Sequence, residues 1–147
     1  MFAPHTATVF NVWEDDNLVR HSNITVLNGV FIDIAKRTNV NKSGLSDADT
    51  CTLFIPFAVE ALSASGAPKL FCNPKQFDAA TDKSGLWTLN PGGSDSSTAT
   101  FFIKGAVTEE LTLAQAKDAY DYVFDVTTVD IRDFGSADMQ HWQVGGR

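Results

Sequence analysis

The chain has 147 residues, of which 44% are hydrophobic and 20% charged, a composition that fits one globular domain and excludes a disordered segment. Eleven basic and eighteen acidic side chains leave a net charge of -7, which argues against specific capture of nucleic acid but not against surrounding a duplex without gripping it. The opening MFAPHTATVF lacks the regions of a signal peptide, and no stretch approaches 18 apolar residues. We therefore expect a single domain over residues 1–147, made in and retained in a cytoplasm, with no membrane contact.

The first third of the sequence predicts extended structure. Residues 6–13 (TATVFNVW) are rich in strand formers, and the acidic residues 14–17 that follow predict a turn. Residues 18–20 are predicted to return as a short strand. Residues 22–34 (SNITVLNGVFIDI) alternate as one long strand, although Asn28 and Gly29 are typical of a tight turn. Because the apolar alternation continues across this pair, a bulge or a sharp bend of a barrel strand is equally favoured.

A change of character follows at residues 36–49 (KRTNVNKSGLSDAD). The segment has three basic residues, a Ser-Gly pair and no sustained apolar period, which predicts a long exposed loop. Loops of this length inside a compact domain are usually functional or mobile.

The middle of the chain predicts short elements. Residues 50–59 (TCTLFIPFAV) form a strand in which Pro56 marks an edge or a bulge. Short strands are predicted at residues 69–72 and 86–89, and Asn73 before Pro74 predicts the start of one helical turn.

The last third predicts a loop, a strand, a helix and a hairpin. A flexible loop at residues 90–97 precedes a strand at 98–107, and Thr112 is placed to cap a short helix. Residues 120–147 form a strand, a turn-rich bend and a second strand, with the first strand apolar enough to be covered on both faces. Without βαβ alternation, these elements predict a mainly β fold: a small antiparallel β-barrel or sandwich with one or two short helices and long loops.

Candidate chemistry is sparse. Asp130, Asp133, Asp138 and His141 flank one bend and could bind a divalent metal, but aspartates populate turns because they hydrogen-bond their own backbone, and no metal-loop motif accompanies them. The Asp133-Phe134-Gly135 triplet lacks the other parts of a kinase signature.

The two cysteines and three tryptophans offer little more. Cys51 and Cys72 are interpreted as reduced, buried thiols, since one bridge is no disulfide framework. A carbohydrate- or peptide-binding module using Trp13, Trp87 or Trp142 stays open, although tryptophan in a strand more often lies in a core or an interface. We predict no catalytic residue, no metal, no cofactor and no enzyme activity.

Five segments carry a resemblance to a known group of proteins. They are MFAPHTATVFN, ITVLNGVFIDIAK, DKSGLWTL, TFFIKGAV and the ending YVFDVTTVDIRDFGSADMQHWQVGG. Together they resemble small structural proteins encoded among the head genes of long-tailed phages of Gram-positive bacteria. The order of elements is also similar to phage head-closure proteins (stoppers, or head–tail joining proteins), which are small β-barrels that form rings.

The resemblance implies a structural role in the virion, at the neck, after assembly in the host cytoplasm. Copies of the protein would form a six-fold ring. This ring would contact a portal or adaptor ring on the head side and a tail terminator or tail tube on the tail side. It would surround packaged double-stranded DNA without sequence-specific binding. Channel-facing or interface positions implied in the long loop are Lys36, Arg37, Asn39, Asn41, Lys42 and Asp47. The aromatic residues proposed for the interface are Trp87, His141 and Trp142.

Alternatives within the same class are a tail terminator, an adaptor or a capsid decoration protein. They differ from a head-completion ring in copy number per particle.

Overall fold

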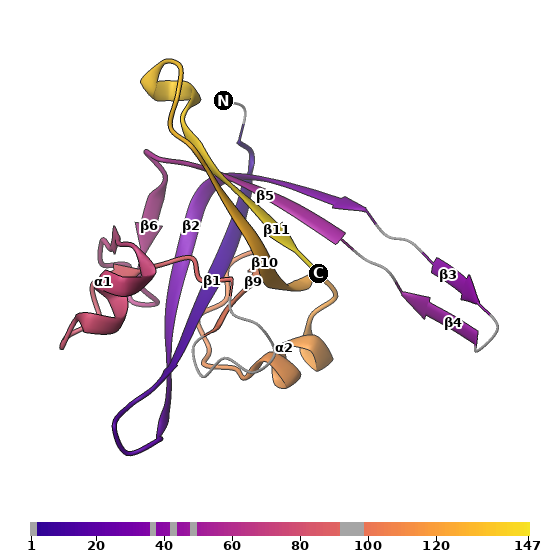
Figure 1. The fold of residues 1–147 in the computed structure, drawn as a ribbon, viewed down its shortest axis with the longest axis horizontal. Coiled ribbons are helices and arrows are strands. Elements are labelled where there is room, and N and C mark those ends of the chain that lie inside the picture. Colours follow the sequence, from indigo (N-terminus) through magenta and orange to yellow (C-terminus); the bar gives the residue numbers. More distant parts are fainter. Residues whose placement is uncertain (1–2, 36–37, 42–43, 48–49, 92–98) are drawn as a thin grey trace.

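The computed structural model describes residues 3–35, 38–41, 44–47, 50–91 and 99–147 (Figure 1). Six antiparallel strands follow one another around a closed barrel in the order β1, β9, β10, β11, β5, β2, and β2 pairs again with β1. Their bounds are β1 His5–Glu14, β2 Arg20–Ala35, β5 Thr50–Pro56, β9 Ala99–Lys104, β10 Val123–Arg132 and β11 His141–Gly146. The predicted mainly β, antiparallel fold is confirmed, and of the two architectures left open the chain forms the barrel.

Strand β2 is continuous from Arg20, so the separate short strand predicted before it does not exist. The Asn28 and Gly29 pair lies inside this strand as a bulge, because the β1 register shifts between His5 opposite Val30 and Thr6 opposite Asn28. Gly29 has a φ of 92°, a left-handed conformation that glycine adopts without steric cost. The bulge alternative is therefore confirmed.

The segment predicted as a long loop contains a hairpin instead. Strands β3 (Thr38–Asn41) and β4 (Gly44–Asp47) pair antiparallel as a separate two-stranded sheet. Residues 36–49 have no sustained apolar alternation, but the hydrogen bonds between paired strands join backbone groups and do not require it. A prediction based on hydrophobic pattern could not detect this pairing.

The inside of the barrel holds the main apolar core, to which the connection between β5 and β9 also contributes. That connection contains β6 (Glu60–Leu62), β7 (Leu70–Phe71), α1 (Pro74–Ala79) and β8 (Leu86–Trp87), with β7 and β8 paired in parallel. Both short strands and the helix start agree with the sequence prediction. Core residues come from every barrel strand and from the segment after β8. They include Val9, Leu27, Leu53, Trp87, Leu89, Phe102, Phe124, Trp142 and Val144.

A buried amide fixes the β8 segment against the barrel. The Asn11 side chain donates to the carbonyl oxygen of Thr88 at 2.7 Å and to Thr100 Oγ1 at 3.2 Å, and its Oδ1 accepts from the Thr88 N–H at 3.2 Å. Buried polar groups are tolerated when they are hydrogen-bonded in this way.

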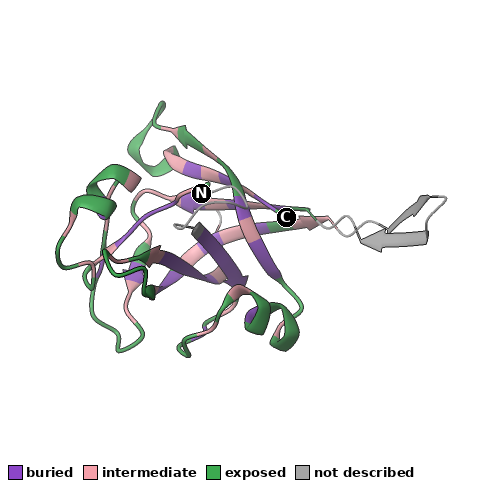
Figure 2. Ribbon diagram, turned by 60° about the horizontal axis from the view of Figure 1, so that its bottom comes forward, coloured by how far each residue is buried: buried purple, intermediate pink, exposed green. Residues whose placement is uncertain are grey.

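A second apolar cluster lies on the outer wall of the barrel under α2 (Leu113–Ala119) (Figure 2). Phe10 and Phe101 stack with ring centres 4.6 Å apart, and Ala116 of the helix is buried against this cluster. Thr112 caps the helix as predicted, since its hydroxyl accepts from the Gln115 N–H at 3.2 Å.

The β10–β11 hairpin is confirmed, but the prediction that β10 is covered on both faces is wrong for its second half. The register shifts between Val126 and Thr128, so Thr127 is a bulge. Beyond it, β10 residues are largely exposed, and Figure 1 shows the hairpin extending past the barrel. Once the strand leaves the barrel, no second layer remains to cover it.

Cys51 is buried and Cys72 half-buried, and both thiols are free. Neither described helix is long and apolar enough to cross a membrane.

Candidate interaction surfaces

The aromatic residues proposed for an interface divide into two groups. Trp87 is 1% exposed and Trp142 is 7% exposed, and their rings meet edge to face with centres 5.6 Å apart inside the core. They have little surface to offer a partner. His141 is half-buried on the outer wall, where its ring lies 5.7 Å from that of Phe54.

The tryptophans also do not form an exposed coplanar platform. Trp13 is half-buried, stacked on His21 at 5.6 Å and edge-on to Phe77 at 5.5 Å, and the other two belong to the core. A sugar-stacking surface built from all three is not present.

The six candidate positions in the long loop can be placed only in part. Asn39 and Asn41 lie in β3 and Asp47 in β4. Lys36, Arg37 and Lys42 lie outside the described residues.

Three large apolar side chains are exposed at the end of the β10–β11 hairpin, which we call the hairpin tip. Ile131, Phe134 and Met139 are 57%, 68% and 54% exposed. The bend is held by η1 (Ala137–Met139), in which the Met139 N–H donates to the carbonyl oxygen of Ser136 at 2.9 Å, and by Gly135, whose φ is 86°. The bend of the tip is therefore held by its own backbone, while the Phe57 N–H donates to the carbonyl oxygen of Gln140 at its end at 3.2 Å.

The hairpin tip is also acidic. Asp133 and Asp138 both lie in the bend and are exposed. The Ser136 side chain hydrogen-bonds the Asp138 carboxyl and lowers its pKa below the usual value. At neutral pH the apolar side chains are consequently flanked by negative charge.

A second surface feature is a groove between the β1–β2 end of the barrel and α2, which we call the α2 groove. Its volume is about 470 Å³, within the range of protein binding pockets. Buried Val12 and Phe101 line it together with half-buried Leu111 and Leu113. Its polar lining residues are Arg20, His21, Ser22, Glu110, Thr112, Gln115 and Asp125.

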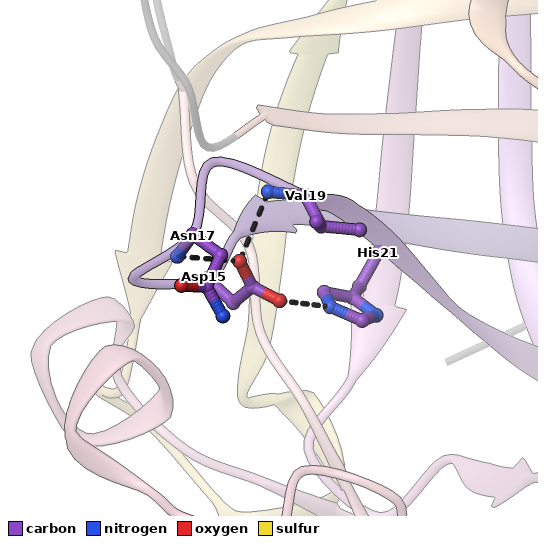
Figure 3. Close-up of polar contacts among 4 residues, drawn as sticks. All are labelled: Asp15, Asn17, Val19 and His21. Atoms are coloured by element: carbon purple, nitrogen blue, oxygen red, sulfur yellow. Dashed lines mark hydrogen bonds and ion pairs between the residues drawn. The ribbon is translucent and has the colours of Figure 1, made fainter.

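The β1–β2 turn leads into His21, which lines the α2 groove, and Figure 3 shows the hydrogen bonds that hold this turn. Asp15 Oδ1 accepts from the N–H groups of Asn17 and Val19, each at 2.9 Å, while Oδ2 lies 2.8 Å from His21 Nε2. The His21 hydrogen bond is the largest of the causes that lower the pKa of Asp15. The turn places Leu18 at a φ of 60°, a left-handed conformation that is strained for leucine.

A buried lysine lies on the other side of β2. Lys69 is 5% exposed, and its Nζ donates to Asn23 Oδ1 at 2.8 Å, the carbonyl oxygen of Ile24 at 3.1 Å and Thr25 Oγ1 at 2.7 Å. All three acceptors are neutral, so burial lowers the pKa of Lys69 to about 8. Its burial suits a structural role better than contact with a ligand.

Within the described ranges, no group of three or more His, Cys, Asp or Glu side chains is placed to hold a metal ion. The hairpin residues Asp130, Asp133, Asp138 and His141 are accordingly not gathered into such a group.

The α2 groove was not foreseen from the sequence. It combines residues from β1, β2, β9, β10 and the segment around α2, which extend along the chain from Val12 to Asp125, and no local pattern links them. The hairpin tip could have been predicted from the sequence as an exposed apolar site, because Phe134 and Met139 are large apolar residues inside a turn-rich segment.

Fold and surfaces together define a small β-barrel protein with an exposed apolar tip at one place and an apolar groove at another, features typical of proteins that bind other proteins. The chain belongs to a family of unknown function, DUF6751, whose sequence pattern matches residues 2–147. No curated protein and no solved structure matches the chain.

Proposed function

We propose that this protein is a structural component of a tailed bacteriophage virion, forming a homo-oligomeric ring at the head–tail joint that retains packaged DNA and docks the tail. The observation that carries the proposal is the hairpin tip, an exposed apolar surface on a closed barrel. Exposed apolar groups of this kind mark protein-binding surfaces. The sequence resemblance described above, which extends over nearly the whole chain, selects the virion as the setting.

The shape of the tip suits a constitutive contact. The η1 turn and the hydrogen bond from Gln140 Nε2 to the carbonyl oxygen of Gly135 at 3.3 Å hold the bend. A preformed contact surface loses less conformational entropy on binding than a flexible one. Such a surface fits assembly of identical subunits into a ring.

The charge of the chain suits a channel around DNA. A net charge of -7 gives a ring of several copies a strongly negative field. DNA inside such a ring would be repelled from the wall and left free to move. A basic wall would instead bind the phosphates tightly and in a salt-dependent way.

The distribution of perturbed titratable groups supports assembly over catalysis. Lys69 and Cys51 are buried at separate places, Cys72 is half-buried after β7, and Asp15, Asp82 and Asp138 lie on separate turns. Active sites usually gather such groups in one cleft. In the described part of the chain they do not converge.

Deleting the gene from the phage that encodes it tests the proposal. We expect filled heads that leak DNA, together with free tails, and complementation by the gene supplied in trans should restore particles. Infectious particles of normal appearance from the deletion phage would refute the proposal.

Copy number separates the ring from its alternatives. A single ring contributes about a dozen copies or fewer to each particle, whereas a capsid decoration protein is present in far larger numbers. Quantitative mass spectrometry of purified particles measures this, and cryo-electron microscopy of the neck distinguishes a head-completion ring from a tail terminator or an adaptor.

A further inference from the structure

The hairpin tip and the α2 groove lie at opposite ends of the barrel. Figure 1 shows the η1 turn at the top of the view and α2 at the bottom. The two surfaces therefore cannot meet within one chain. A contact between them requires two copies.

We propose that the hairpin tip of one copy inserts into the α2 groove of a second copy. This inference rests on the proposed ring and names its subunit contact. A contact between two different surfaces of the same chain is heterologous, and it repeats from copy to copy until the rotation closes a ring.

The apolar parts of the two surfaces are complementary. The tip offers Phe134 and Met139, both more than half exposed, and the groove offers a floor of Val12 and Phe101 with Leu111 at its side. An apolar centre surrounded by polar groups is the usual arrangement of a protein interface. Burial of the two tip side chains would provide its centre.

One charge of the groove is complementary to the tip. Asp133 and Asp138 flank the tip, and Arg20 lines the groove, whereas the groove residue His21 already lies 2.8 Å from Asp15. Among the residues that the structure describes, Arg20 makes no salt bridge, so it is available to an acidic partner.

The acidic side chains of the groove set the orientation of the inserted tip. Asp125 already lies 3.8 Å from Lys117, whereas Glu110 is exposed and forms no salt bridge with any described residue. Docking should therefore turn the acidic tip toward Arg20 and away from Glu110, because opposite charges favour one register and like charges disfavour the other.

Site-directed cross-linking tests the contact. One preparation carries Phe134→Cys and the other Leu111→Cys, each in a Cys72→Ser background so that the half-buried native thiol does not react; Cys51 is only 3% exposed. Mixing the two under mild oxidation should give a heterodimer linked by a disulfide. Leu70→Cys, at a residue 72% exposed on β7, is the matched control and should not link to Leu111→Cys.

A charge exchange tests the register. Asp133→Arg and Arg20→Asp should each weaken self-association in sedimentation equilibrium by roughly tenfold or more, and the double variant should recover part of the loss. Asp121→Arg, an exposed change outside both surfaces, should leave self-association unchanged. Thermal melting of each variant confirms that it is folded.

The outcomes separate this contact from the proposed function. Rings in electron micrographs without the Phe134–Leu111 cross-link would overturn the contact and leave the ring standing. A specific cross-link, combined with an unaffected deletion phage, would support the contact and refute the virion role. Monomeric protein without any cross-link at high concentration would overturn the inference.

Discussion

The two halves of β10 show how one strand serves two purposes. From Val123 to Val126 the strand lies in the barrel wall, with Phe124 and Val126 packed in the core. After the bulge at Thr127 the same strand leaves the wall, and Ile131 is 57% exposed. The residue types change little across the bulge, but their surroundings change completely.

Side chains in the barrel stabilise the fold, whereas those at the tip are exposed to partners. In a packed core each large side chain contributes through burial and contacts. At an exposed tip the same kind of side chain contributes almost nothing to folding and remains available to a partner. Substitutions should therefore separate the two regions.

The largest expected difference comes from truncating one phenylalanine in each region. Phe102→Ala, at a residue with 0% exposure, should lower the free energy of unfolding by about 3–5 kcal/mol because it leaves a cavity. Phe134→Ala, at 68% exposure, should change it by no more than about 0.5 kcal/mol. Urea unfolding of the monomer measures both, and equal losses would abolish the distinction between barrel and tip.

Substitutions at two adjacent glycines of β11 test where the packed core ends. A Cβ at Gly146 would lie 2.9 Å from Phe124 Cβ and 2.9 Å from Phe102 Cζ, so Gly146→Ala should cost about 1–3 kcal/mol by overpacking. At Gly145 the nearest atom is the rotatable hydroxyl of Thr128, and Gly145→Ala should cost less than about 1 kcal/mol. Chemical unfolding of the two variants side by side would contradict this account if Gly145→Ala were the more damaging.

The buried lysine makes stability depend on pH in the alkaline range, whereas Asp138 of the tip, whose pKa is lowered, acts only in the acidic range. Lys69 has its pKa lowered from 10.5 to about 8, so above pH 8 the folded state binds fewer protons than the unfolded state and stability rises with pH. Burial also raises the pKa of Cys51 from 9.0 to about 12, which lowers stability above pH 9. Between pH 8 and 9 the effect of Lys69 should exceed that of Cys51 and should raise the free energy of unfolding by about 1 kcal/mol.

Melting curves across that interval provide the measurement. The unfolding temperature of the wild type should rise from pH 8 to pH 9, and Lys69→Met should remove the rise. Lys75→Met, at an exposed position of α1, should keep it. A wild-type melting temperature that falls over this interval would show that Lys69 does not carry the effect.

The smallest expected change in stability comes from a substitution in the β1–β2 turn, whose backbone differs from that of the hairpin tip. The hairpin tip places a glycine, Gly135, at a positive φ of 86°, whereas the β1–β2 turn places Leu18 at 60°. Leu18→Gly relieves a strain of roughly 1–2 kcal/mol and loses part of it to the greater freedom of glycine in the unfolded chain, for a net gain of about 0.5 kcal/mol. Val19→Gly, next in the chain, should instead destabilise the protein, and a loss of stability in Leu18→Gly would reject the assignment of strain.

Local sequence signals were enough for most of the barrel. Runs of strand-forming residues predicted β1, β5 and β9, apolar alternation predicted β2, and Thr112 and Asn73 predicted the helix starts, because strand preference and capping depend on neighbours in the chain. The β3–β4 hairpin was not predicted, because a polar hairpin has no apolar period to detect. The distal half of β10 was misjudged because an apolar strand predicts burial only where another layer exists to cover it.

The candidate interaction surfaces were harder to predict from the sequence than the fold. Trp87 and Trp142 were proposed for an interface and lie in the core instead, since nothing local distinguishes an aromatic residue that faces inward from one that faces outward. The channel positions among residues 36–49 remain a prediction.

The amino-acid order alone determined that this chain forms paired strands with short capped helices, because those choices follow from the backbone and from side chains a few positions apart. Only the tertiary structure decided that the strands close into a barrel, that two tryptophans fill it, and that an apolar tip and an apolar groove are left at its opposite ends. Burial is a property of what surrounds a residue, and distant parts of the chain supply those surroundings.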